Sequence, residues 1–139
     1  MEETYLFVYG TLRKGFALLI PEKIASDIEW VGYSKVKGKL YDIGKYPGAV
    51  PDDSGKLFIK GEIIKIKAPG KVFKYLDNYE GYDVEDVQAS EYCRSKEWFN
   101  LEDGTIVEAW IYWYNFAVNG KKRIDENDYI KFLQKNQLA

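Results

Sequence analysis

Residues 4–13 read Thr-Tyr-Leu-Phe-Val-Tyr-Gly-Thr-Leu-Arg. The first six of these residues are β-branched, aromatic or aliphatic, which predicts a buried strand that Gly10 ends in a turn. Backbone N–H groups that leave a strand through a glycine can form a concave nest for an anion. Residues 9–12 are therefore either a carboxylate-binding loop or an ordinary turn after the first strand.

The rest of the chain alternates between strand-like and helix-like patterns. Strands are predicted at residues 29–43, 57–67, 87–99 and 106–116, and helices at residues 69–79 and after Asp125. Residues 16–20 are predicted to form a short helix or a turn. In the long strand, Gly32 and Gly38 permit the bends and bulges of a curved sheet. Residues 46–55 have the turn-forming types of an ordered loop. These patterns predict one α+β domain over residues 1–139, a small closed or strongly curved mixed β-barrel with short flanking helices.

Composition disfavours several classes of partner. The chain has 139 residues, and 20 Lys and Arg against 22 Asp and Glu leave a net charge of −2. Such a balance disfavours nucleic acid or an anionic membrane, and no apolar run approaches the roughly 18 residues of a membrane span. The Met-Glu-Glu start lacks a basic segment followed by an apolar one, and the single cysteine cannot form an internal disulfide. We therefore expect a cytoplasmic protein without a nucleic-acid or membrane partner, as a monomer or small homo-oligomer.

The absence of histidine narrows the chemistry further. Imidazole is the commonest metal ligand and the usual base near neutral pH, so a general base must be a carboxylate, a lysine, a tyrosine or Cys93. No histidine can activate Cys93, and a buried strand cysteine is the simpler interpretation. Gly10 and Gly15 have the spacing of a phosphate loop, but Phe16 and Ala17 replace its Lys and its Ser or Thr. We predict neither a metal site nor a cofactor.

Five ordered blocks carry a resemblance to a known family. They are Val-Tyr-Gly-Thr-Leu-Arg at 8–13, Leu-Tyr-Asp-Ile-Gly-Lys-Tyr-Pro-Gly-Ala-Val at 40–50, Leu-Asp-Asn-Tyr-Glu-Gly-Tyr at 76–82, Glu-Tyr-Cys-Arg at 91–94 and Ala-Trp-Ile-Tyr-Trp-Tyr at 109–114. In this order they resemble the γ-glutamylcyclotransferase-like superfamily, in particular its small bacterial and archaeal, AIG2-like branch. The resemblance implies a small mixed barrel with flanking helices. It also implies a cofactor-free reaction in which the α-amine of a γ-glutamyl group attacks its own γ-carbonyl, giving 5-oxoproline and a free amine or amino acid.

The resemblance also implies which residues bind the substrate. The glutamyl group would be held through the backbone amides of Tyr9, Gly10, Thr11 and Leu12. On the later strands, Arg94 lies two residues from Tyr92, and Tyr114 lies two residues from Tyr112, so each pair shares one face. Such pairs either line a cavity or pack in the core. We take Tyr114 as a candidate substrate-binding residue, with Arg94 and Tyr112 as weaker candidates.

The same resemblance makes Glu80 the acid/base group. One carboxylate suits the reaction, because the α-ammonium must lose a proton before it attacks and the departing amine must gain one. If Tyr79 and Tyr82 shield Glu80 from water, desolvation would raise its pKa toward the working range. From the residues alone, a solvated carboxylate at a helix end is the commoner situation. Some close relatives in the small branch lack the Glu-Gly but keep the Glu-Tyr-x-Arg block, so Glu91 is a second acid/base candidate.

Two functions of different classes remain open. The first is a cyclotransferase that acts on a γ-glutamyl amine, a γ-glutamyl amino acid or a γ-glutamyl-lysine. The second is a barrel that binds a small carboxylate ligand without turnover. The direction of Glu80 separates them, because an enzyme needs this side chain in the cavity beside residues 9–12. Arg13 and Lys14 would add only a minor positive field near this loop.

Overall fold

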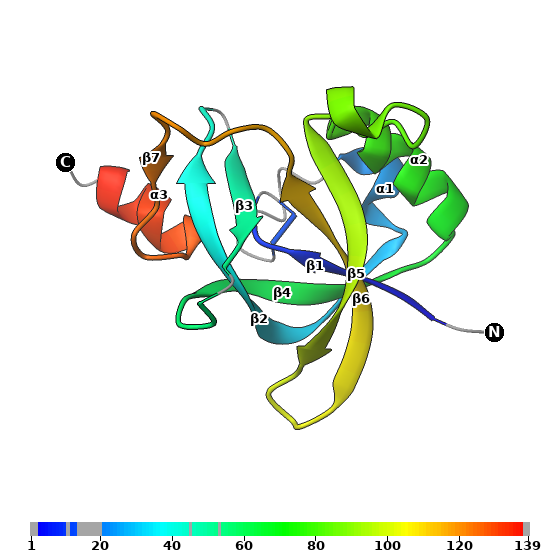
Figure 1. The fold of residues 1–139 in the computed structure, drawn as a ribbon. Coiled ribbons are helices and arrows are strands. Elements are labelled where there is room, and N and C mark those ends of the chain that lie inside the picture. Colours follow the sequence, from blue (N-terminus) through cyan, green and yellow to red (C-terminus); the bar gives the residue numbers. More distant parts are fainter. Residues whose placement is uncertain (1–2, 11, 14–20, 45, 53, 138–139) are drawn as a thin grey trace.

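A computed structural model describes residues 3–10, 12–13, 21–44, 46–52 and 54–137 (Figure 1). Its elements in chain order are β1 (Thr4–Val8), α1 (Glu22–Ala25), β2 (Ile28–Asp42), β3 (Pro47–Pro51), β4 (Phe58–Ile66), α2 (Pro69–Tyr79), η2 (Val87–Ala89), β5 (Tyr92–Asn100), β6 (Ile106–Tyr114), β7 (Lys122–Arg123) and α3 (Tyr129–Gln137). The mixed α+β class predicted from the sequence is confirmed. The short helix or turn predicted at residues 16–20 lies outside the described residues.

The strands form one curved, open sheet. Their order is β3-β2-β4-β1-β6-β5, with β7 added to β2, and the pairing of β1 with β6 is parallel whereas the other pairings are antiparallel. Within the described residues β3 and β5 are the two ends of this path and do not pair with each other. The closed alternative of the predicted barrel is therefore wrong, and the strongly curved alternative describes the sheet.

The curvature is concentrated in β2, where the sequence predicted it. Residues 28–37 of this strand pair with β4, whereas residues 38–42 pair with β3, and the register shifts between Trp30 and Gly32. At the change of partner, a Cβ on Gly38 would lie 2.8 Å from Cδ1 of Ile59 and 2.9 Å from the carbonyl oxygen of Val50. Only glycine fits such an approach without displacing its neighbours. The bend in β2 visible in Figure 1 thus depends on this residue.

The core lies on both faces of β1, which explains why its sequence is continuously apolar. Leu6 and Val8 belong to the cluster that includes the buried face of α2, and Phe7 stacks on Phe99 on the opposite face, with ring centroids 4.7 Å apart. Helix α2 has the predicted bounds and buries residues at helical spacing. In Figure 1 α2 and α3 lie at opposite ends of the sheet. The site described below forms on the α2 side of β1.

Three local predictions are corrected. The strand predicted at residues 87–99 begins only at Tyr92, because residues 87–89 form the 3-10 helix η2. Residues 47–51, expected within a loop, form strand β3, and proline is tolerated at both of its ends because β3 is an edge strand. The cap of α3 is Asp128 and not Asp125, because its Oδ1 accepts hydrogen bonds from the amides of Ile130 and Lys131. No helix in the described part of the chain is long and apolar enough to cross a membrane.

Candidate active site

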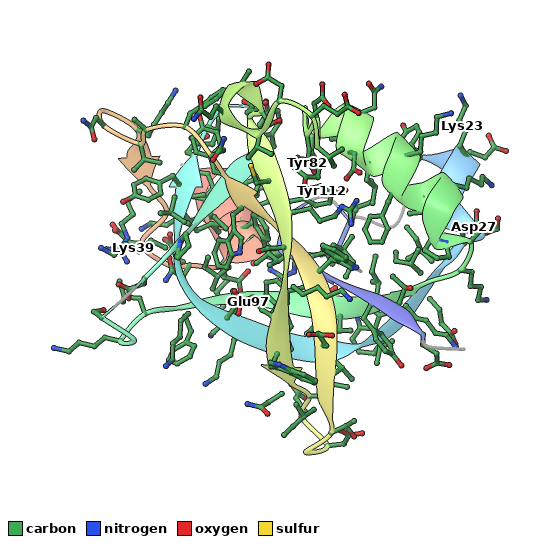
Figure 2. All side chains as sticks on the ribbon, turned by 45° about the vertical axis from the view of Figure 1, so that its right-hand side comes forward. Lys23, Asp27, Lys39, Tyr82, Glu97 and Tyr112 are labelled. Atoms are coloured by element: carbon green, nitrogen blue, oxygen red, sulfur yellow. The ribbon has the colours of Figure 1, made fainter. Side chains whose placement is uncertain are left out.

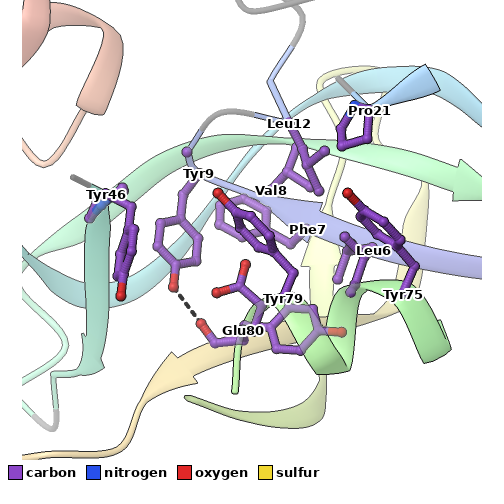
Figure 3. Close-up of a pocket in the computed structure, with 14 residues that line it drawn as sticks. Leu6, Phe7, Val8, Tyr9, Leu12, Pro21, Tyr46, Tyr75, Tyr79 and Glu80 are labelled. Atoms are coloured by element: carbon purple, nitrogen blue, oxygen red, sulfur yellow. Dashed lines mark hydrogen bonds between the residues drawn. The ribbon is translucent and has the colours of Figure 1, made fainter. Parts of the chain in front are cut away.

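A cavity of about 190 Å³ opens where β1 ends and α2 stops (Figure 3). A water molecule needs roughly 10–15 Å³ on the same scale, so the cavity has room for a small metabolite. Its wall includes Tyr9, Gly10 and Leu12 after β1, Tyr46 and Pro47 before and in β3, Tyr75 and Tyr79 of α2, Glu80 directly after that helix, and Tyr112 of β6. Of the described lining residues, Glu80 alone carries a carboxylate or a cation. Any charge chemistry contributed by this wall therefore centres on Glu80.

The backbone at the end of α2 places Glu80 at the cavity. The amide of Tyr82 donates to the carbonyl of Asp77 at 2.8 Å, and the amide of Gly81 donates to the carbonyl of Asn78 at 3.3 Å. This pair of bonds is the Schellman motif, in which the residue after the last helical one adopts the left-handed conformation. Gly81 has φ +65°, which favours glycine there. The Glu-Gly sequence is thus a helix stop that fixes the direction of the Glu80 side chain.

The carboxylate of Glu80 points into the cavity beside the ring of Tyr9, as Figure 3 shows. Desolvation by burial and, as the smaller cause, the nearby charge of Glu91 together raise its pKa from 4.5 to about 7. Tyr79 lines the cavity as expected, but its ring is 59% exposed, and Tyr82 is not among the lining residues. The pKa of Glu80 is raised, as predicted. The apolar surroundings of its carboxylate include residues of β1, which line the cavity, and do not include Tyr82.

Glu91 lies next to Glu80 without lining the cavity. Its amide donates to the carbonyl of Gly81 at 3.1 Å, which brings the start of β5 against the helix stop. The hydroxyl of Tyr46 donates to both carboxylate oxygens of Glu91, at 2.9 and 3.0 Å. Burial and this hydrogen bond raise the pKa of Tyr46 to about 12. Tyr46 lines the cavity and Glu91 does not, so Glu91 is linked to the cavity wall through the neutral phenol of Tyr46.

Buried tyrosines complete the surroundings of the two carboxylates. Burial is the largest cause that raises the pKa values of Tyr9, Tyr92 and Tyr112 well above their usual range, and the charge of Glu80 contributes in the same direction at each. These phenols therefore stay neutral near pH 7 and act as hydrogen-bonding groups. Tyr46 is not among the residues predicted for the site, although it lies in the sequence block at 40–50.

The predicted binding loop lies at the cavity in the part that is described. Tyr9 is buried, and its hydroxyl donates to the backbone carbonyl of Tyr112 (dashed in Figure 3). Gly10 and Leu12 line the cavity, and among the described residues no group accepts a hydrogen bond from either amide. Thr11 lies outside the described residues. Unpaired amides beside a cavity provide donors for a bound carboxylate.

Arg13 differs from its expected role. The side chain is only 5% exposed, and it forms ion pairs with Glu62 at 2.6 Å and with Asp128 at 2.9 Å. It is not among the cavity-lining residues. Arg13 therefore connects the loop after β1 to β4 and to the cap of α3. The expectation that Arg13 adds a positive field at the loop is corrected, because its charge is used in these structural ion pairs. Lys14 lies outside the described residues.

The three strand candidates have different surroundings. Tyr112 lines the cavity. Tyr114 is buried but does not line it, and its ring packs edge-on against Tyr92 with centroids 5.3 Å apart. Arg94 is also absent from the wall, because its guanidinium pairs with Asp77 of α2. The predicted shared face of Tyr92 and Arg94 packs against α2, and Arg94 contacts Asp77 and Phe73 of that helix.

Comparison with known proteins defines the class to which this fold and site belong. The family model described as "Gamma-glutamyl cyclotransferase, AIG2-like" matches residues 6–131. The chain belongs to this family. It is 31% identical over 113 residues to the "putative gamma-glutamylcyclotransferase" of Methanocaldococcus jannaschii, covering 79% of this chain and 83% of that protein.

Solved structures show the same fold. An uncharacterized protein from Pyrococcus horikoshii superposes with a TM-score of 0.62 at 19% identity, covering 98% of both chains. YkqA from Bacillus subtilis superposes with a TM-score of 0.69 at 22% identity. That match covers 99% of this chain, which spans 44% of the Bacillus protein. The family membership supports a cyclotransferase-type function and a small-molecule substrate.

Proposed function

We propose that this protein is a cofactor-free γ-glutamylcyclotransferase that converts a γ-glutamyl amine or amino acid into 5-oxoproline and the free amine. The observation that carries the proposal is the Glu80 carboxylate, which lies in a mostly apolar cavity that also borders Gly10 and Leu12. A pKa of about 7 lets this group both accept and return a proton near neutral pH. Family membership supports the same reaction class.

In this proposal each part of the site has its own task. The amides after β1 hold the α-carboxylate of the glutamyl group. Glu80 takes a proton from the α-ammonium, and the freed amine attacks the γ-carbonyl carbon to form the ring C–N bond. When the tetrahedral intermediate collapses, the bond to the leaving nitrogen breaks and Glu80 returns its proton there. Two protons pass in all from the attacking to the leaving nitrogen, so the carboxylate ends as it began.

A screen of γ-glutamyl compounds for released 5-oxoproline tests this proposal. Its panel should include a γ-glutamyl amine, a γ-glutamyl amino acid and γ-glutamyl-lysine, with each compound also measured for binding. Turnover of at least one of them is expected. Saturable binding of these compounds without any 5-oxoproline would instead identify the protein as a non-catalytic domain that binds small carboxylates.

The pH dependence of activity should reflect the Glu80 pKa. Because the base must be ionised, kcat/KM is expected to rise with pH through a midpoint near 7. Glu91→Gln removes one cause of the raised pKa, so its midpoint should move down while activity is retained. Burial is the larger cause, so the midpoint should stay above 4.5. Loss of activity in Glu91→Gln would make Glu91 the acid/base group.

Activity should not depend on a metal ion. The substrate carries its own nucleophile, and no group of three or more potential metal ligands comes together among the described residues. Dialysis against a chelator is expected to leave kcat unchanged. Loss of activity that Mg²⁺, Mn²⁺ or Zn²⁺ restores would contradict this mechanism.

A further inference from the structure

A single carboxylate at the end of α2 joins the helix to β5 and β6. Asp77 Oδ1 accepts hydrogen bonds from Nε of Arg94 at 2.9 Å and from the hydroxyl of Tyr112 at 2.6 Å. Its Oδ2 accepts a further bond from Nη2 of Arg94 at 2.9 Å. Three donors from two strands thus converge on one side chain. We call this group, Asp77, Arg94 and Tyr112, the Asp77 clamp.

The clamp is largely buried and its cation is held by aromatic rings. The side chains of Arg94 and Asp77 are 14% and 19% exposed. The Arg94 guanidinium lies 4.2 Å from the ring centroid of Phe73 and 4.4 Å from that of Trp110. A bidentate guanidinium–carboxylate pair has a fixed planar geometry, and stacking on aromatic faces restricts it further. The position of Asp77 relative to the sheet is therefore tightly defined.

The clamp is connected to both parts of the proposed site. On one side, Asp77 lies three residues before Glu80 on the same helix face, and its carbonyl accepts the Tyr82 amide that forms the helix stop. On the other side, the carbonyl of Tyr112 accepts the Tyr9 hydroxyl, and Tyr112 itself lines the cavity. Figure 2 shows Tyr112 and Tyr82 on the side of β5 and β6 that faces α2. Asp77 thus links the helix stop at Glu80 to Tyr112, which holds Tyr9 at the start of the loop after β1.

We propose that Asp77 is a positioning residue that holds the Glu80 carboxylate in register with the loop at residues 9–12. This inference rests on the proposed cyclotransferase function. Asp77 is not among the residues that line the cavity, so it would act through Glu80 and Tyr112 and not on the substrate. Positional errors near 1 Å can reduce turnover by about 10²-fold. Loss of the clamp should therefore lower kcat more than it raises KM.

The test compares variants that remove the clamp in different ways with a matched control. Asp77→Asn removes the ion pair, and Tyr112→Phe removes one hydrogen bond without changing charge or the backbone carbonyl. Asp27→Asn is the control, because it also removes a carboxylate that pairs with a cation at 2.9 Å. Its partner Lys71 lies in the first turn of α2, and neither residue lines the cavity. We expect Asp77→Asn to lower kcat by roughly 10- to 100-fold with KM changed by less than about 3-fold. Tyr112→Phe should show a smaller loss of kcat, and Asp27→Asn should match the parent.

A titration of the Glu80 carboxyl by NMR supplies a readout that needs no turnover. If the helix end moves and lets the carboxylate reach water, the Glu80 midpoint should fall toward 4.5 in Asp77→Asn and in Tyr112→Phe, but not in Asp27→Asn. A shift of the Glu80 midpoint in Tyr112→Phe reports a change in the position of the Glu80 carboxylate, because this substitution removes no charge. If the parent turns over no γ-glutamyl compound, the proposed function fails while this titration still tests the clamp.

Several outcomes would overturn the inference. They are an unchanged kcat in folded Asp77→Asn, an equal loss of kcat in Asp27→Asn, and an unchanged Glu80 midpoint in both clamp variants. If Asp77→Asn does not fold, Tyr112→Phe and Arg94→Lys decide the question. Arg94→Lys keeps the charge but not the bidentate geometry, so an intermediate loss of kcat is expected, and parental kcat in both variants would refute positioning.

Discussion

Replacing Glu80 by glutamine should lower kcat by about 10²–10⁴-fold while leaving the affinity for a γ-glutamyl compound nearly unchanged. Glutamine keeps the shape of the side chain and its hydrogen-bonding capacity at the cavity, but it cannot take the proton from the α-ammonium. Steady-state kinetics with 5-oxoproline detection give kcat, and calorimetry gives the affinity. Near-parental kcat in this variant would remove Glu80 from the mechanism and bring Glu91 forward.

The same variant has an independent consequence for stability. The pKa of Glu80 is raised from 4.5 to about 7 in the folded protein, so the folded state binds this proton more tightly than the unfolded state. The resulting stabilisation is complete below about pH 4.5 and is lost as the pH rises through 7. Glu80→Gln should therefore unfold at a higher temperature than the parent at pH 8 and at a similar temperature near pH 4. Thermal unfolding at both values checks the sign.

Replacing Arg13 by methionine should destabilise the fold by about 3–5 kcal/mol. The guanidinium contacts both Glu62 and Asp128, whose side chains are 1% and 10% exposed, and methionine leaves these carboxylates in the interior without their shared cation. Asp128 also caps α3, so the last helix should loosen as well. Urea unfolding of the variant and the parent, compared by extrapolation to water, measures the difference.

A matched surface variant shows whether burial is the deciding factor. Lys65 and Glu3 form an ion pair with the same 2.6 Å separation as Arg13 and Glu62, but their side chains are 31% and 53% exposed. Exposed pairs contribute about 0–1 kcal/mol, so Lys65→Met should stay within that range. A loss in Arg13→Met no larger than that in Lys65→Met would contradict the structural role given to Arg13.

The sequence could predict the elements whose hydrophobic pattern is local. Strand β1 is apolar on both faces because both are covered, and α2 has its expected bounds because Val72, Phe73 and Leu76 recur at helical spacing after Pro69. These features depend on neighbours within a few residues. For Glu80 the residues alone favoured a solvated carboxylate at a helix end, and only the family resemblance indicated a place in the site.

Features that depend on distant partners were not accessible. Arg13 looks like a solvated loop cation, because Glu62 and Asp128 are 49 and 115 residues away in the sequence. For Arg94, the alternation of the strand predicted the face that it shares with Tyr92. No local pattern indicated that its partner is Asp77, which lies 17 residues earlier in the chain. Whether the curved sheet closes likewise depends on the meeting of β3 and β5, which no local pattern specifies.

The helix stop at Glu80 and Gly81 also makes the length of α2 a part of the site. A helix turns by about 100° per residue, so one residue inserted between Leu76 and Glu80 would swing the carboxylate around the axis while the buried face stayed in place. The same insertion after Gly81 would leave that orientation intact. Changes in loop length between α2 and β5 are thus compatible with the site, whereas a change of a single residue within the last turn of α2 is not.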